Sequence, residues 1–227
     1  MNSQSVLVII PAKERSTRLP GKNMKDLCGK PMMAYPILAA KGAHGVNRVV
    51  VSTESEKIKK IAEQYGAEVP FLRPIELTED AVTSQDVLVH ALDELKKLEG
   101  YEPDYVLLLY PTSPLLSRER IEQAIALAIE KNADSVISGH YDKGHYWVEA
   151  EGGGWQRLYP TELVNSQYQK PLFVENGAIY MTRASILRKQ LIADRAQVLL
   201  MEQDENVDVD YPEDFAKVEA IMKSRTM

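Results

Sequence analysis

The chain has 227 residues, of which 44% are hydrophobic, and its formal net charge is -6. This length and composition predict one main α/β domain with a sizeable buried core. The acidic balance argues against a general nucleic-acid-binding protein, which would present a strongly basic face. A single cysteine, Cys28, excludes an internal disulfide and a cysteine-rich zinc site, and fits a reducing cytoplasm. The first residues lack the basic start and long apolar run of a signal peptide or membrane span, so we expect a soluble cytoplasmic protein with no membrane partner.

A short apolar run near the start of the chain leads into a strongly basic loop. Residues 6–10 are rich in β-branched side chains and end at Pro11, which predicts a buried strand. The loop that follows carries Lys13, Arg15, Arg18 and Lys22. Ligands of open α/β sheets bind at the carboxyl ends of strands, and converging cations suit a polyphosphate. We interpret the segment as a loop that binds a nucleotide triphosphate, although it lacks the P-loop pattern; a solvated basic loop is the alternative.

Helical periodicity and buried apolar runs alternate along the rest of the chain. Amphipathic spacing with terminal prolines and glycines predicts helices over residues 31–43, 55–65, 84–98, 118–131, 183–191 and 212–222, with Thr83 or Ser84 as the N-cap of the third. Apolar runs predict strands at residues 48–53, 68–71, 105–110, 135–138, 176–181 and 198–200. The strand at 105–110 is nearly all apolar, as expected of a central strand, and the strand at 68–71 is expected at an edge. The alternation predicts a mainly parallel sheet with right-handed crossovers.

Residues 139–174 interrupt this alternation. The segment holds many aromatic residues on both sides of Gly152-Gly153-Gly154, a pattern that predicts an excursion of two or more antiparallel strands, such as a lid or a dimer arm. A floppy surface insertion is the alternative. The spacing of His140 and His145 matches no metal motif, so we predict no metal there. We therefore expect a main domain of residues 1–138 and 175–227, with residues 139–174 as an inserted arm.

Two aspartates alternate just before the last predicted helix. If residues 206–210 are extended, Asp208 and Asp210 point to the same side and can share a divalent cation with phosphates, as Mg²⁺ sites commonly do. The alternative is a polar turn in which Asp210 caps the last helix. The acidic pair and the basic loop can meet at the carboxyl edge of the sheet. Together they suit phosphoryl or nucleotidyl transfer, which depends on positioning and on neutralising phosphate charge.

Several motifs occur in one order over nearly the whole chain. They are the loop at residues 10–23, Ser52-Thr53, Arg73-Pro74, Leu77, Asp80, the helix start at residues 84–92, Pro111-Thr112-Ser113-Pro114-Leu115, Asn176-Gly177-Ala178-Ile179-Tyr180 and Val207-Asp208-Val209-Asp210. This ordered set resembles the CMP-sialic acid synthetase (acylneuraminate cytidylyltransferase) family. The resemblance implies a Rossmann-like, three-layer α/β/α nucleotidyltransferase domain with a mixed, mainly parallel sheet and an inserted dimerisation arm.

The resemblance also implies an activity and a set of site residues. CMP would pass from CTP to an acidic keto-sugar: the anomeric hydroxyl attacks the α-phosphorus, and pyrophosphate leaves in an Mg²⁺-dependent reaction. Lys22 and Asp210 would be catalytic, and Asp208 and Asp210 would hold the metal. The nucleotide would be bound by Ala12, Lys13, Arg15, Ser16, Lys22, Asn23, Arg73 and Ser84. The sugar would be bound by Tyr110, Thr112, Ser113, Gln167, Phe173 and Asn176. Family members are homodimers whose arm crosses to the partner's site, so we expect a homodimer.

Three departures from the family pattern bear on the substrate. Lys13 stands where the family usually has arginine, and lysine lacks the planar fork that grips phosphate; Arg15 or Arg18 could compensate. Tyr110 replaces a usual glutamine, and Asn165-Ser166-Gln167 replaces an Arg-Gln pair of sialate-using members. The last two changes suggest a different acceptor, such as legionaminic acid or another nonulosonate, whose carboxylate Lys170 could hold. The alternatives are transfer from another nucleotide to a sugar 1-phosphate, as in an amino-sugar guanylyltransferase, and a catalytically silent nucleotide-binding relative.

Overall fold

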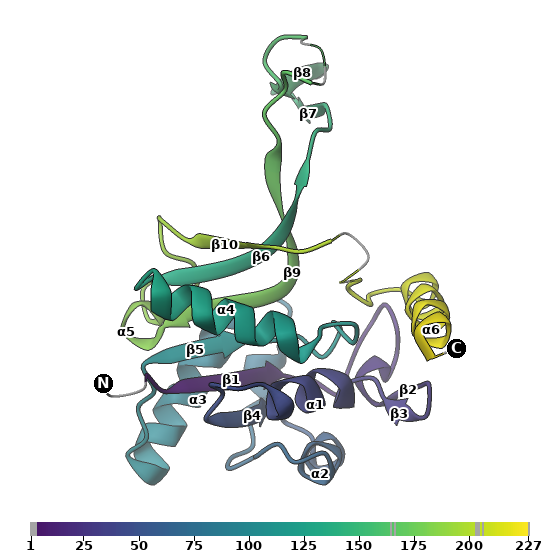
Figure 1. Ribbon diagram of the computed structural model, residues 1–227. Coiled ribbons are helices and arrows are strands. Elements are labelled where there is room, and N and C mark those ends of the chain that lie inside the picture. The colour runs from purple at the N-terminus through teal and green to yellow at the C-terminus, as the bar shows by residue number, and fades with distance from the viewer. Residues whose placement is uncertain (1–3, 164, 166, 203–204, 206, 227) are drawn as a thin grey trace.

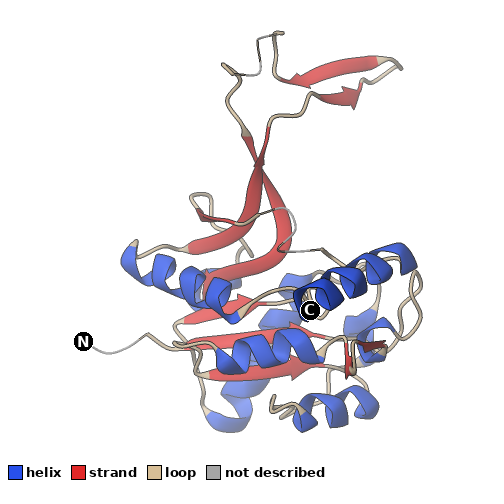
Figure 2. Ribbon diagram, turned by 45° about the vertical axis from the view of Figure 1, so that its right-hand side comes forward, coloured by secondary structure: helices blue, strands red, loops and turns tan. Residues whose placement is uncertain are grey.

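A six-stranded mixed sheet forms the centre of the molecule (Figures 1 and 2). The computed structural model describes residues 4–226 except 164, 166, 203, 204 and 206. The strand order is β10-β6-β9-β5-β1-β4. These strands are β1 (Val6–Pro11), β4 (Arg48–Ser52), β5 (Tyr105–Leu108), β6 (Ser135–Asp142), β9 (Leu172–Arg183) and β10 (Gln197–Leu200). Three of the pairings are parallel, whereas β9 runs antiparallel to both β5 and β6. The mixed, mainly parallel sheet confirms the predicted fold class.

Helices cover both faces of this sheet, because the side chains of β1 alternate between two cores. Val6, Val8 and Ile10 enter a core formed with α1 (Ala34–Gly42), α2 (Glu56–Gln64) and α4 (Arg118–Glu130). Leu7 and Ile9 enter the opposite core, formed with α3 (Ser84–Glu99) and α5 (Ala184–Leu187). The chain is therefore a three-layer α/β/α structure. Because helices cover both faces of the sheet, the connecting loops lie at the ends of the strands.

A third apolar cluster attaches the C-terminal segment to the basic loop. Val209 and residues of α6 (Pro212–Thr226) pack with Leu19 and Leu27. The same region contains the short 3-10 helix η1 (Lys22–Met24) and the two-residue strands β2 (Asp26–Leu27) and β3 (Lys30–Pro31). This packing brings the last part of the chain against the loop that follows the first strand.

Some predicted elements are shorter than expected or missing. Residues 68–71 do not form a strand: Glu68 makes one isolated parallel bridge with Val50, and Pro70 has no N–H to continue a ladder. The helix predicted at residues 183–191 ends at Leu187, because the chain folds back so that the Leu191 carbonyl accepts a hydrogen bond from the Thr182 hydroxyl. The first helix begins at Ala34 because Pro31 belongs to β3.

The aromatic segment contains the predicted antiparallel strands. β7 (Tyr146–Glu149) and β8 (Trp155–Tyr159) form a hairpin that stands away from the body on the extended ends of β6 and β9 (Figure 1). All three glycines of the turn have positive φ, which favours glycine. Gly139 lies where this extension begins: an added Cβ would come within 2.1 Å of the Val174 carbonyl oxygen.

Membrane-spanning helices are not found in the part of the chain that the structure describes, since no helix there combines the necessary length and apolar character.

Candidate active site

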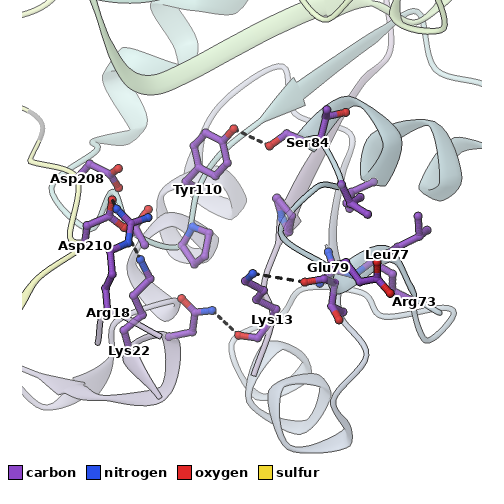
Figure 3. A pocket seen from close by; sticks show the side chains of 18 residues that line it. Lys13, Arg18, Lys22, Arg73, Leu77, Glu79, Ser84, Tyr110, Asp208 and Asp210 are labelled. Atoms are coloured by element: carbon purple, nitrogen blue, oxygen red, sulfur yellow. Dashed lines mark hydrogen bonds and ion pairs between the residues drawn. The ribbon is translucent and has the colours of Figure 1, made fainter. Parts of the chain in front are cut away.

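A cavity of about 300 Å³ lies at the carboxyl ends of β1 and β5 (Figure 3). It is enclosed by the loop after β1, the segment from Arg73 to Val87, the residues that follow β5, and the segment before α6. Nine of the predicted site residues line it: Lys13, Lys22, Asn23, Arg73, Ser84, Tyr110, Thr112, Asp208 and Asp210. The structure thus gathers at one sheet edge residues that are widely separated in sequence.

The basic loop is held in shape by its own polar contacts. Gly21 adopts the left-handed conformation with φ of 66° and starts the turn of η1. The buried Asn23 side chain donates a hydrogen bond to the Lys13 carbonyl at 2.9 Å, which joins the two ends of the loop. An adjoining hollow is lined by Arg15 and Ser16. The loop can therefore present several cations to one anionic ligand.

Lys13 reaches across the mouth of the cavity. Its Nζ lies 3.2 Å from Asp80 Oδ1 and 3.4 Å from the Thr78 carbonyl oxygen, on the segment that contains η2 (Ile75–Thr78). Ala12, in contrast, is fully buried in the core and offers no side chain to the cavity.

The acidic pair meets the basic loop directly. Lys22 Nζ lies 2.8 Å from Asp210 Oδ1 although the two residues are 188 positions apart, and Arg18 Nη1 lies 2.7 Å from Asp210 Oδ2. The cap of α6 is made instead by Asp214, which accepts hydrogen bonds from the backbone N–H groups of Asp210 and Tyr211. Asp210 therefore faces the cavity, and the capping role that was the alternative falls to a different aspartate.

Asp208 lines the cavity wall together with Asp210 and Thr112. Solvent reaches Asp208, yet the surrounding protein raises its pKa by desolvation, and the negative charge of Asp210 raises it further. A cation between the two carboxylates would relieve this cost. The described residues contain no cluster of three or more histidine, cysteine or acidic residues suited to a metal. The donor set fits a metal that takes its remaining ligands from phosphate and water, as Mg²⁺ does.

The opposite side of the cavity is more apolar and contains a buried cation. Figure 3 shows Arg73 and Leu77 on this side, away from the acidic pair. The Arg73 side chain is only 3% exposed and pairs with Glu54 at 3.1 Å. Burial lowers the pKa of Arg73, a sign that its charge is poorly solvated there. Val82 and Val87 complete an apolar wall on which a base or sugar ring can pack.

Tyr110 bridges this side to the end of β5. Its hydroxyl lies 2.7 Å from Ser84 Oγ, and its ring meets that of Tyr180 edge to face at 6.3 Å. Ser84 is available for this contact because Thr83 is the N-cap of α3, in a capping box with Asp86. Burial raises the pKa of Tyr110, so the phenol is a neutral hydrogen-bonding group at physiological pH.

Four predicted sugar-binding residues do not line this cavity. Ser113 is buried next to Thr112, and Gln167 lies in an exposed turn of the arm. Phe173 lies against Gly139, and Asn176 accepts hydrogen bonds from the Ser138 hydroxyl and the Ala178 N–H. Within one chain these four stay apart from the nucleotide side, and their role in sugar binding stays a prediction. Ser166, in the Asn165-Ser166-Gln167 segment that differs from the family pattern, lies outside the described residues.

Two residues of the site were not assigned to it from the sequence. Arg18 was counted among the four cations of the basic loop and as a possible substitute for the missing loop arginine, but its pairing with Asp210 was not predicted. Glu54 had no assigned role. Its contact with Arg73 depends on the direction of its side chain in the folded protein. The position of Arg18 in the basic loop could have indicated that Arg18 belongs to the site. No local sequence pattern indicates the same for Glu54.

Comparison with known proteins shows the family. Residues 7–226 match the family model described as cytidylyltransferase. The chain belongs to the cytidylyltransferase family. It is 33% identical to the CMP-N,N'-diacetyllegionaminic acid synthase of Legionella pneumophila, with 96% of each chain covered. It is 31% identical to the N-acylneuraminate cytidylyltransferase of Escherichia coli, where 92% of this chain aligns with 50% of that protein. These findings confirm the predicted resemblance.

Solved structures support the fold of this cytidylyltransferase. CMP:2-keto-3-deoxy-manno-octonic acid synthetase complexed with CTP superposes with a TM-score of 0.75 at 18% identity, covering 97% of this chain and 99% of that one. The 4-diphosphocytidyl-2C-methyl-D-erythritol synthase of Anaerococcus prevotii superposes with a TM-score of 0.69 at 13% identity, covering 98% and 97%. At these identities the likeness speaks for the nucleotidyltransferase fold alone.

Proposed function

We propose that this cytidylyltransferase moves CMP from CTP to a nonulosonic acid and releases pyrophosphate. The observation that carries the proposal is that one cavity brings Arg18 and Lys22 together with Asp208 and Asp210, opposite the buried Arg73. Cations placed beside two carboxylates suit a triphosphate with its metal, and the apolar side suits a nucleoside. The similarity over nearly full length to a synthase named for a CMP-activated legionaminic acid supports an acidic keto-sugar as the acceptor.

Each side of the cavity would hold one part of the nucleotide. Lys13, Lys22 and the hollow lined by Arg15 and Ser16 would hold the triphosphate, while Asn23, Arg73 and Ser84 would contact the nucleoside. The anomeric hydroxyl of the sugar would attack the α-phosphorus, and the bond from that phosphorus to the bridging oxygen would break. Lys22 would stabilise the charge that develops on the phosphate oxygens, and fixed cations do this without reorganising during the step.

Asp208 and Asp210 are the residues that would hold Mg²⁺. When bound, this ion would neutralise charge on the phosphate oxygens. Arg18 and Lys22 supply positive charge beside Asp210. When the nucleotide binds, Arg18 and Lys22 would contact the triphosphate. Asp210 would then have Mg²⁺ beside it as the positive charge in their place.

The sugar would sit beyond Tyr110 and Thr112, between the cavity and an arm from a second copy of the chain. This homodimer would bring Gln167, Phe173 and Asn176 toward a partner's site, which accounts for their absence from the cavity of their own chain. Exposed aromatic residues on the arm support the arrangement, since Trp155 is 69% exposed. We also propose a cytoplasmic location, which fits a chain with the single cysteine Cys28.

The test is a pyrophosphate-release screen with purified protein and Mg²⁺. CTP, UTP, GTP and ATP are each combined with sialic, legionaminic and pseudaminic acids, 3-deoxy-manno-octulosonate and hexosamine 1-phosphates. We expect turnover with CTP and a nonulosonic acid only. Strong turnover of GTP or UTP with a sugar 1-phosphate would overturn the cytidine assignment, and tight CTP binding without turnover on any sugar would identify a silent relative.

A further inference from the structure

Glu54 connects two parts of the nucleotide site without lining it. It follows the end of β4 and lies between the basic loop and the segment that begins at Arg73. Its Oε1 accepts a hydrogen bond from the backbone N–H of Glu14 at 2.7 Å. Its Oε2 accepts a hydrogen bond from the Arg73 guanidinium at 3.1 Å. One carboxylate therefore fixes the loop with one oxygen and the buried arginine with the other.

Arg73 depends on this contact for its position. The arginine is buried, and Glu54 is its only ion-pair partner among the described residues. Its Nε has no hydrogen-bond partner in that part of the chain. A buried guanidinium needs a nearby anion, and removing one member of a buried pair leaves an uncompensated charge. Loss of the Glu54 charge should therefore displace the Arg73 side chain.

The loop is fastened to the same short segment. The Glu14 carboxylate accepts hydrogen bonds from Lys57 Nζ at 2.8 Å and from the Ser55 hydroxyl at 2.5 Å. Ser55 also caps α2, because its Oγ accepts from the backbone N–H groups of Lys57 and Ile58. The start of α2 thus serves as a rigid base for the loop, and Glu54 extends that base to Arg73.

We propose that Glu54 is a positioning residue of the nucleotide site, holding Arg73 and the loop backbone at the spacing that one nucleotide spans. The inference rests on the proposed function, in which the loop binds the triphosphate and Arg73 contacts the nucleoside. Glu54 acts before chemistry, by keeping the free protein in the geometry that binds nucleotide. Its loss should therefore weaken nucleotide binding more than it slows turnover of the bound complex.

Glu54→Gln is the informative variant, because glutamine keeps an acceptor for the Glu14 N–H but lacks the charge that holds Arg73. We expect a roughly tenfold rise in the KM for CTP with kcat changed by less than about threefold. The calorimetric Kd for CTP should rise in parallel. The matched control is Glu56→Gln, since Glu56 is an exposed acid two residues further along in the first turn of α2. That control should keep the parent KM and Kd.

A double-mutant cycle distinguishes positioning from general weakening. In an Arg73→Met background, Glu54→Gln should add little to the loss of CTP affinity, because the group that it positions is gone. If the two substitutions weaken CTP binding independently, so that their fold-changes in Kd multiply, the proposal is overturned. An unchanged KM and Kd in Glu54→Gln alone would overturn it as well. If Glu54→Gln unfolds, Glu54→Asp keeps the charge on a shorter stem and should also raise the KM. A parent KM in Glu54→Asp would then overturn the proposal.

The design also separates failure of this inference from failure of the proposed function. If the parent protein releases no pyrophosphate from CTP with any nonulosonic acid, the proposed function fails. The calorimetric comparison of Glu54→Gln with Glu56→Gln still tests the positioning role, using whichever of the four nucleotides the parent protein binds.

Discussion

Lys13 is the loop residue at which the family resemblance led us to expect an arginine. Its ammonium group spans the cavity mouth to Asp80 and Thr78. Lys13→Met should raise the KM for CTP by roughly tenfold, because one charge-assisted contact to phosphate is lost. Lys13→Arg should keep or lower the KM, since a guanidinium binds phosphate in two places. Initial rates of pyrophosphate release measure both effects.

Asp80→Asn is the control for this prediction. It removes the charge that pairs with Lys13 while leaving the lysine in place. Its KM for CTP should not rise. A Lys13→Met enzyme with the parent KM would show that Arg15 or Arg18 already supplies the charge that Lys13 was assigned.

Asp210 and Asp214 make a second test at the scale of single residues, because neighbouring carboxylates have different partners. Asp210→Asn should remove most turnover and change the melting temperature little, since its carboxylate lines the cavity and the start of α6 keeps its contacts with Asp214. Asp214→Ala should do the reverse: it removes the acceptor for two backbone N–H groups at the start of α6 and costs about 1 kcal/mol of stability.

Thermal denaturation and steady-state kinetics on both variants provide the comparison. Asp214→Ala should retain its kcat at a temperature well below its transition. Full activity in Asp210→Asn would remove Asp210 from the proposed metal site and from catalysis.

The arm formed by β7 and β8 is the element that we propose contacts a second copy of the chain. Trp155 and Leu158 of β8 are 69% and 61% exposed, and Trp147 and Val148 of β7 are also exposed. Several exposed apolar side chains on one hairpin are typical of a surface that contacts another protein. Trp155→Glu combined with Leu158→Lys should convert a dimer to a monomer, because charges would be buried without partners. Light scattering coupled to size-exclusion chromatography measures the mass.

Leu98→Lys is the matched control for the arm. Leu98 lies in α3 and is 52% exposed, so the substitution changes charge on the body and leaves the arm intact. Its mass should equal that of the parent. A monomeric parent protein, or an arm variant that stays dimeric, would contradict the proposed assembly.

Elements with strong local signals were predictable, and those that depend on distant packing were not. The capping box of Thr83 and Asp86 and the apolar face of α3 lie within one stretch of sequence, so that helix begins as predicted, at Ser84. Residues 68–71 have strand-like composition, but Phe71 is used to pack under α3, and only Glu68 pairs with β4. Composition alone does not distinguish these two uses of a β-prone segment.

For the molecule as a whole, the place of the candidate site in the fold was predictable from the sequence. The ion pairs between its charged side chains were not. Carboxyl ends of strands share one edge of a sheet, so the meeting of the basic loop with Asp208 and Asp210 could be expected from topology. The contacts of Arg18 with Asp210 and of Glu54 with Arg73 could not, since they depend on side-chain directions set by the folded backbone. The role in sugar binding predicted for Gln167 on the arm stays a prediction, because that residue does not line the cavity of its own chain.

The whole fold should respond to the nucleotide, because the cavity is closed by segments from both ends of the chain. Leu19 of the loop and Val209 beside the acidic pair belong to one apolar cluster with α6, so ligand contacts on either side stabilise the packing of the C-terminal segment. CTP with Mg²⁺ at about 100 times its Kd adds about 2.7 kcal/mol to the free energy of unfolding. For a domain of this size, that raises the melting temperature by roughly 5–10 °C.

Differential scanning calorimetry measures this shift and identifies what produces it. GTP at the same concentration should give little shift, because the cavity is proposed to select a cytosine nucleotide. Chelation of Mg²⁺ should reduce the shift with CTP, and Asp208→Asn should make the remaining shift insensitive to Mg²⁺, since one of the two proposed metal ligands is then lost. Equal shifts with CTP and GTP would contradict the nucleotide assignment. A shift in the parent protein that does not depend on Mg²⁺ would place the metal away from Asp208 and Asp210 and leave Lys22 and Arg18 as the main source of charge for the triphosphate.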